Sequence, residues 1–158
     1  MAMVAIDGRA QESFTTFFQE VEPRLRYALI AALGHDRGRE ATSEAMAYAW
    51  EHWDRIEAME NPAGYLYRVG RSRGRVRWRR YRFNPVSAPG FPEMEPGLPE
   101  ALRSLSENQR IAVFLVYGME WTRREVSDLL GISINSVGNH LERGLRKLWR
   151  ALGVRIDD

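Results

Sequence analysis

The residues of this chain that could do chemistry are arginines and aromatic side chains gathered in one stretch. Between Arg68 and Arg82, eight of fifteen residues are arginine, with tyrosine and tryptophan among them. On a helix, the arginines at positions 68, 71, 75, 79 and 82 would form one stripe, and no acidic residues lie at the neighbouring helical spacing. Guanidinium groups bind phosphate and exposed rings stack on unpaired bases, so the stretch favours nucleic-acid binding. A solvated charged helix, a membrane surface and an acidic protein are the alternatives.

A second stretch with a chemical signature runs from Trp121 to Leu148. Thr122 and Glu125 have the spacing of a capping box, Gly131 can end the first helix, and Ser133 can cap the second. Two helices joined in this way predict a helix-turn-helix, which places its second helix in the major groove of DNA. An ordinary helical hairpin is the alternative.

The elements that position both stretches are all predicted to be helices. Pro23 should kink or split the first of them, Gly34 to Arg39 should form a loop, and Asn61-Pro62 is a helix start signal. Apolar residues at helical spacing predict helices over residues 12–33, 40–56, 61–82, 99–105 and 107–117, followed by the helix-turn-helix. Ser106 and Gln109 form another capping box before the helix at 107.

A proline-rich segment divides the chain, because five of its seven prolines lie between Asn84 and Pro99. The predicted fold class is all-α, with two small helical domains joined by this linker. The predicted boundaries are a disordered tail at 1–11, a first domain at 12–83, the linker at 84–98 and a second domain at 99–158.

Composition excludes several classes of protein. The 158 residues contain no cysteine, so disulfides and thiolate metal sites are excluded. No apolar run reaches the ~20 residues that span a bilayer, and no signal-peptide core begins the chain, so we expect a soluble cytoplasmic protein without a membrane. Three scattered histidines, at 35, 52 and 140, and the lack of catalytic motifs predict no enzyme, no metal, no cofactor and no small-molecule substrate. Glu51 and His52 are expected on the surface.

The order of these parts resembles a known family. The segment LRSLSENQRIAVFLVYGMEWTRREVSDLLGISINSVGNHLERGLRKL resembles region 4 of the sigma factors of bacterial RNA polymerase. FTTFFQEVEPRLRYALIAALG, SEAMAYAWEHWDRI and NPAGYLYRVGRSRGRVRWRR are similar to region 2 of the same family. The chain is thereby identified as a member of the extracytoplasmic-function (ECF) type of the sigma-70 superfamily.

This resemblance implies partners and site residues. It implies core RNA polymerase, through its β′ clamp helices and β flap, and promoter DNA in duplex and single-stranded form; it also allows an anti-sigma factor. The −10 element would be read and melted by Asn61, Tyr65, Tyr67, Arg68, Arg71, Arg75, Trp78 and Arg79. The −35 element would be bound by Arg123, Asn135, Ser136, Asn139, His140 and Arg143. Polymerase would contact Glu40, Glu44, Trp50 and Asp54.

Two departures from the family pattern bear on this function. Ala41, Thr42 and Ser43 stand where the family usually has a leucine, a valine and a glutamine, which should weaken the polymerase contact. Gly138 and His140 stand where a lysine and an arginine are common, which should weaken −35 binding.

Two other functions compete with this one. The segment GISINSVGNHLERGLRKL also resembles the LuxR-type effector motif, which would make the chain a DNA-binding regulator without sigma activity. A degenerate sigma-like adaptor, which binds polymerase or an inhibitor without starting transcription, is the third possibility.

Overall fold

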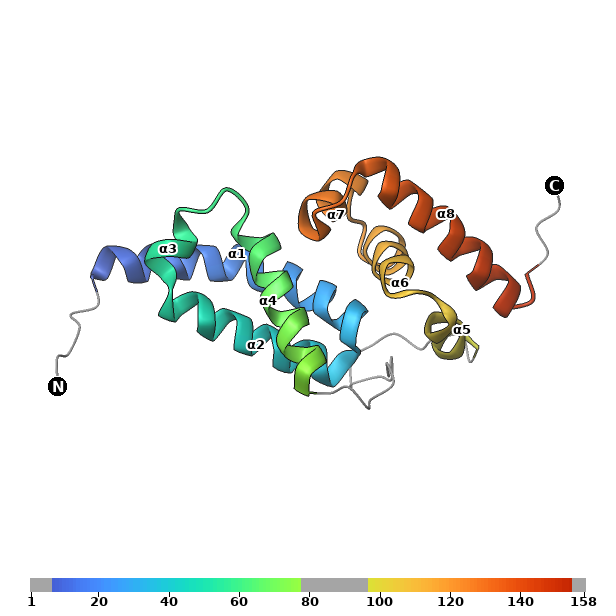
Figure 1. Cartoon of the computed structure of the whole chain (residues 1–158), viewed down its shortest axis with the longest axis horizontal. Coiled ribbons are helices and arrows are strands. Elements are labelled where there is room, and N and C mark those ends of the chain that lie inside the picture. The colour runs from blue at the N-terminus through green and yellow to red at the C-terminus, as the bar shows by residue number, and fades with distance from the viewer. Residues whose placement is uncertain (1–6, 78–96, 155–158) are drawn as a thin grey trace.

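The computed structural model describes residues 7–77 and 97–154, which form helices joined by short turns and contain no strand (Figure 1). The all-α prediction is confirmed. The N-terminal half consists of α1 (Gly8–Leu33), α2 (His35–Glu51), α3 (Trp53–Glu57) and α4 (Pro62–Arg77). The C-terminal half consists of α5 (Leu98–Ser104), α6 (Glu107–Val113), the π-helix η1 (Phe114–Gly118), α7 (Arg123–Leu130) and α8 (Ile134–Ala151). The proline-rich linker lies mostly outside the described residues.

Helix α1 differs from its prediction at both places where sequence signals suggested a break. It begins at Gly8, where the side chain of Asp7 accepts a hydrogen bond from the backbone N–H of Arg9, so residues 8–11 are helical rather than disordered. It also continues through Pro23 without dividing. Proline costs ~3 kcal/mol in a helix interior, and the fully buried Leu25 and Leu29 in the next turns show the packing that offsets this cost.

The loop predicted from Gly34 to Arg39 is wrong, because α2 begins at His35 directly after Gly34. Gly34 makes the turn with a φ of 93°, a conformation that favours glycine. One turn later, a Cβ at Gly38 would lie 2.4 Å from the Cα of Ile30. Helices α1 and α2 therefore pack backbone to backbone from the first turn of α2, which the sequence pattern did not reveal.

Two other predicted helices are not continuous α-helices in the structure. The helix predicted over 40–56 is divided at His52, which leaves the helical conformation and separates α2 from α3. The helix predicted over 107–117 becomes the π-helix η1 at Phe114. Trp53, at the start of α3, is buried between Phe14 and Phe17 and donates its indole N–H to the Ser13 hydroxyl at 2.8 Å.

The C-terminal half follows its sequence signals closely. Both capping boxes, Ser106 with Gln109 and Thr122 with Glu125, are present in full. Gly131 ends α7 in the left-handed conformation, with a φ of 67°. The side chain of Ser133 caps α8 by accepting from the backbone N–H of Ser136. Helices α7 and α8 therefore form the predicted helix-turn-helix, and the buried side chains of its core are Val126, Leu129, Val137 and Leu141.

The two halves lie against each other (Figure 1). Helix α1 contacts α6 and η1, and α4 contacts α7. Within the described residues, no helix is long and apolar enough to span a membrane.

Candidate nucleic-acid interface

The outer face of α8 presents polar side chains in a row. Asn135, Asn139 and Arg143 follow one another at intervals of four residues, and all three are exposed. Ser136 and His140 are half-buried beside them, while Val137 and Leu141 anchor the opposite face in the core. The structure thus brings all five predicted residues of the recognition helix onto one surface.

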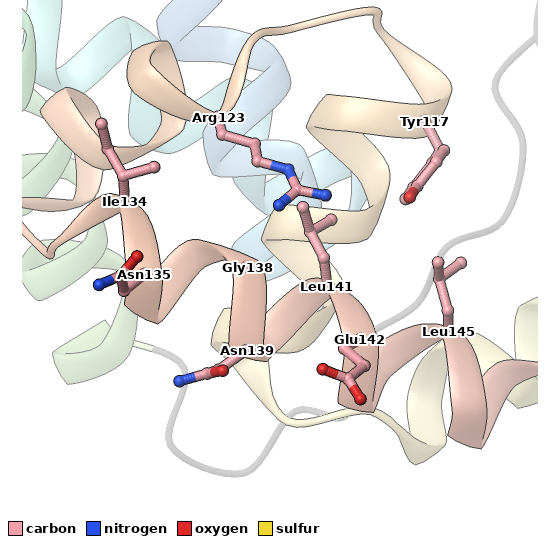
Figure 2. Close-up of a pocket in the computed structure, with 9 residues that line it drawn as sticks. All are labelled: Tyr117, Arg123, Ile134, Asn135, Gly138, Asn139, Leu141, Glu142 and Leu145. Carbon is pink, nitrogen blue, oxygen red and sulfur yellow. The ribbon is translucent and has the colours of Figure 1, made fainter.

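Arg123, the sixth predicted residue of this surface, lies on α7 and extends toward α8 (Figure 2). A Cβ built on Gly138 would lie 3.4 Å from the Nη1 atom of Arg123. The guanidinium therefore lies directly beside position 138 of α8. Together with Tyr117, Asn135 and Asn139, both residues line an open hollow of about 700 Å³. Gly138 has no side chain, and a cation from α7 lies beside its position on α8.

The second predicted surface lies on α4, and its first residues also bridge the two halves. Asn61 caps α4, because its side-chain oxygen accepts from the backbone N–H of Gly64 at 3.0 Å. The amide nitrogen of Asn61 donates to the backbone carbonyl of Asp128 in α7 at 2.7 Å. Arg68 is exposed, and its guanidinium lies 3.5 Å from a Cβ built on Gly131.

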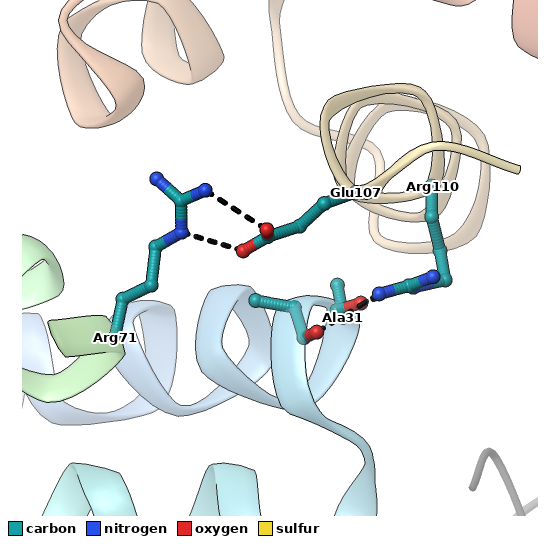
Figure 3. Close-up of polar contacts among 5 residues, drawn as sticks. Ala31, Arg71, Glu107 and Arg110 are labelled. Carbon is teal, nitrogen blue, oxygen red and sulfur yellow. Dashed lines mark hydrogen bonds and ion pairs between the residues drawn. The ribbon is translucent and has the colours of Figure 1, made fainter. Parts of the chain in front are cut away.

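Arg71 makes a bidentate bridging contact to the other half (Figure 3). Its Nε and Nη2 atoms donate to the two carboxylate oxygens of Glu107 at 2.5 and 2.8 Å. This hydrogen bond from the Arg71 guanidinium to Glu107 is the main reason why the pKa of Arg71 is raised, and partial burial opposes it. A residue predicted to hold promoter DNA is therefore held by the other half of the same chain.

Sequence reasoning missed Arg110, the most buried of the bridging cations. Its Nε and Nη2 atoms donate to the backbone carbonyls of Ala31 and Ala32 at 2.8 and 2.9 Å. These carbonyls lie in the last turn of α1, where helical carbonyls lack partners in their own helix. Burial lowers the pKa of Arg110. No sequence pattern marks such a residue, because its partners are backbone atoms 78 and 79 positions away.

A further bridging contact was also not predicted from the sequence. The Arg24 guanidinium pairs with Glu125 at 2.7 Å and lies 4.8 Å from the ring centroid of Trp121. The capping glutamate of α7 thus has a second partner on α1.

One predicted DNA-binding residue is wrong. Tyr67 is only 2% exposed and packs in the core, so its ring is not available to bases. Its position on α4 faces inward with Leu66, whereas Tyr65 is half-buried at the edge of α2. Arg75 lies in α4, and Trp78 and Arg79 lie outside the described residues.

The residues predicted to contact polymerase lie together on α2 and α3. Glu40, Trp50 and Asp54 are exposed and Glu44 is half-buried. Trp50 lies 5.0 Å from the ring of Phe14, and both border a groove of about 320 Å³. This arrangement forms a mixed acidic and apolar surface.

The unusual residues Ala41 and Thr42 lie beneath this surface rather than on it. They are 3% and 2% exposed, and the Thr42 hydroxyl donates to the carbonyl of Gly38 at 2.6 Å. Their small size suits the close approach of α1 and α2. Only Ser43 of the three is exposed, at the edge of the groove. Ala41 and Thr42 therefore do not lie on the predicted polymerase surface, and their effect on a polymerase contact stays a prediction.

Residues 97–148 match the family described as sigma-70, region 4. The C-terminal half is thus similar to region 4 of sigma-70 factors. No curated protein sequence matches the chain. This family match covers the recognition helix, and it favours the sigma-70 superfamily over the LuxR-type motif.

Two solved structures share the fold of nearly the whole chain. The first is the sigma factor RpoE in complex with the anti-sigma factor NepR from Bartonella quintana, at 21% identity and a TM-score of 0.68, over 92% of this chain and 99% of that chain. The second is CnrH in complex with the cytosolic domain of CnrY, at 17% identity and a TM-score of 0.60, over 92% of this chain and 91% of that chain. The region 4 match and this shared fold bear out the predicted resemblance to sigma factors of the ECF type.

Proposed function

We propose that this protein binds core RNA polymerase and directs it to promoters with two elements. The observation that carries the proposal is a region 4 domain with an exposed recognition helix, joined to a second basic and aromatic surface on α4. The proposed role belongs to the cytoplasm, where polymerase and promoter DNA are found.

The recognition helix would bind the −35 element as duplex DNA. Asparagine amides can pair with adenine and arginine with guanine in the major groove, which suits Asn135, Asn139 and Arg143. Ser136 and His140 would contact the edge of the groove. Arg123 would replace, from α7, the phosphate contact that a lysine at position 138 makes in the family.

The α4 surface would bind the −10 element as a single strand. Arg68, Arg71 and Arg75 supply positive charge for the backbone, and Tyr65 supplies a ring at the edge of the helix. Asn61 lies at the start of the same helix. Trp78 and Arg79 would extend the surface beyond the described residues.

Binding both elements at once requires the halves to separate, because Asn61 and Arg71 are engaged by α7 and α6. The exposed and half-exposed ion pairs resist separation weakly, at ~1 kcal/mol or less each. The buried Arg110 contributes more, since hydrogen bonds to charged groups are worth ~1.5–3 kcal/mol. We infer that polymerase supplies the opening energy, with the β′ clamp helices on Glu40, Glu44, Trp50 and Asp54 and the β flap on the C-terminal half.

The closed arrangement favours a second candidate function, the sigma-like adaptor. In that role, the bridging contacts of Arg71 and Arg110 would persist in the bound state and keep the −10 surface covered. An anti-sigma factor would act in the same direction by holding the halves together. Both structural neighbours were solved in complexes, one of them with an anti-sigma factor.

Run-off transcription with purified core polymerase tests the proposal. Holoenzyme formation with transcripts from a subset of a promoter library is the expected result. A stable complex that makes no transcript would establish the adaptor instead. Absence of any complex with core polymerase would overturn both functions.

A further inference from the structure

Glu142 is an acidic residue on the outer face of α8, where the residues proposed to bind DNA are neutral or basic. It lies three residues after Asn139, in the helical stripe formed by positions 135, 139, 142 and 146. Figure 2 shows the side chains of Asn135, Asn139 and Glu142 along the same edge of α8, and all three line the open hollow beside Arg123. Sequence reasoning missed Glu142, although it shares the face of the recognition helix.

The Glu142 carboxylate is exposed and has one oxygen available. Its Oε1 atom accepts a hydrogen bond from the Nη2 atom of Arg146, one turn further along α8, at 2.9 Å. Its Oε2 atom has no hydrogen bond within residues 7–77 and 97–154. The Glu142 side chain is 69% exposed and that of Arg146 is 54% exposed. An exposed pair of this kind adds little to stability, so the pair alone does not explain a carboxylate at this position.

The position of Glu142 along α8 suits contact with base edges. A recognition helix enters the major groove by its N-terminal residues. Glu142 is roughly 10 Å along the helix axis from Asn135, which is less than the groove width of about 12 Å. Arg146 is roughly 16 Å from Asn135 along the same axis, so its guanidinium would face the phosphate backbone beside the groove.

A carboxylate in the major groove distinguishes cytosine from the other bases. An ionised carboxylate only accepts hydrogen bonds. The amino group of cytosine is a donor, whereas guanine and thymine present acceptors, and adenine presents an acceptor next to its amino group. The carboxylate therefore gains a hydrogen bond where it meets cytosine and is repelled by acceptor atoms where it meets another base.

We propose that Glu142 is a specificity-determining residue that selects a C·G base pair in the −35 element. The Oε2 atom would accept from the cytosine amino group, while Arg146 holds the other oxygen and contacts a phosphate. The base pair would be a neighbour of the one that Asn139 contacts, because the two side chains are adjacent on one stripe. The inference rests on the proposed function, and it adds a residue that rejects wrong sequences to residues that favour binding.

Selection of bound duplexes from a library with randomised base pairs tests this role, with the full chain as the binding protein. The unaltered chain should enrich cytosine roughly ten-fold at one position. Glu142→Gln should lose this enrichment and favour adenine at the same position, because a glutamine amide pairs with the N6 and N7 atoms of adenine. The variant should also bind duplexes without cytosine at that position more tightly than the unaltered chain does, since it lacks a negative charge near the phosphates.

Two further variants separate base selection from a structural role. Glu100→Gln is the matched control, because Glu100 forms an exposed pair with Arg103 on α5, and it should select the same sequences as the unaltered chain. Arg146→Ala removes the partner of Glu142 and keeps the carboxylate, so it should weaken binding to all duplexes and retain the preference for cytosine. Circular dichroism should show an unchanged fold for all three variants, since every replaced side chain is exposed.

The results that would overturn the inference are distinct from failure of the proposed function. A base preference that Glu142→Gln leaves unchanged would show that the carboxylate makes only its pair with Arg146. A uniform change in affinity, with no shift at a single position, would mean that Glu142 repels phosphate and selects no base. Lack of duplex binding by the unaltered chain would overturn the inference together with the −35 role of α8. Failure of the proposed function itself would appear separately, as absence of a polymerase complex while duplex selection is intact.

Discussion

The two predicted DNA surfaces differ in what else their residues do. On α8, the exposed Asn135, Asn139 and Arg143 lie on the outer face, and the interior of the same helix holds them in place. On α4, Asn61 and Arg71 also bind the other half of the chain. In the proposed function, the α8 surface can bind duplex DNA as it stands, whereas Asn61 and Arg71 on the α4 surface must first be released from the C-terminal half. We propose that access to the two promoter elements can therefore be controlled separately.

The largest expected effect is a loss of stability and duplex binding from a substitution beneath the α8 surface alone. Leu141 is 1% exposed beneath the recognition helix, and Leu141→Ala should lower the free energy of unfolding by ~3 kcal/mol because it leaves a cavity. Duplex binding should fall while single-strand binding by the N-terminal half is retained. Chemical unfolding and anisotropy check both effects, with the exposed Lys147→Ala as control. Parallel loss of both activities would contradict the independence of the surfaces.

Removing the buried hydrogen bonds of Arg110 should release the α4 surface from the C-terminal half. Arg110→Ala deletes two hydrogen bonds to the end of α1, and it should destabilise the closed arrangement by ~2 kcal/mol. Small-angle scattering should show a larger radius of gyration. Arg146→Ala, which removes an exposed pair with Glu142, should leave the radius unchanged. A compact Arg110→Ala chain would show that apolar contacts alone hold the halves together.

Releasing Arg71 alone from Glu107 should have a smaller effect on single-strand binding by the α4 surface. Glu107→Gln removes the carboxylate charge of the bridge, which is worth ~1 kcal/mol for a partly exposed pair. Single-strand binding should gain about 0.7 in salt slope, since one more cation can reach phosphate. Glu100→Gln on α5 is the control. An unchanged slope would mean that Arg71 does not contact the strand.

Gly138 offers a test of the first surface. Gly138→Ala should stabilise α8 by up to ~0.8 kcal/mol through helix propensity. It should leave duplex binding within about two-fold, because the new methyl group would lie in ordinary van der Waals contact with the flexible Arg123 guanidinium. A double-mutant cycle with Arg123→Ala should show coupling. Additive effects would mean that position 138 and Arg123 act on duplex binding independently.

The smallest expected effect is a pH dependence of the stability that Glu125 contributes. The backbone N–H of Thr122 in the capping box and the Arg24 guanidinium lower the pKa of Glu125. Its contribution is therefore present above the pKa of the unfolded chain and is lost as pH falls through the lower, folded value. Thermal unfolding between pH 6 and 3 should show a loss in the native chain that Glu125→Gln lacks. Equal slopes would mean that this bridge has no part in stability.

The sequence predicted the helix-turn-helix well because its determinants are local. Thr122, Gly131 and Ser133 act on backbone groups within three or four residues, so their spacing carries the information. Apolar spacing likewise identified the buried Val137 and Leu141.

Features set by contacts between distant residues could not be predicted in this way. The close approach of Gly38 to Ile30 and the burial of Tyr67 in the core both depend on how the helices pack. The bridging role of Arg110 depends on carbonyls of α1. Charge and periodicity alone assign such an arginine to solvent, although here it is buried.

The distance between the two halves in the presence of polymerase tests the central claim most directly. The sequence contains no cysteine, so Gln19→Cys and Arg150→Cys, both at exposed positions, allow specific dye labelling. Energy transfer should fall when core polymerase binds, as α4 is released from α6 and α7. Unchanged transfer in a complex that opens promoters would contradict the account.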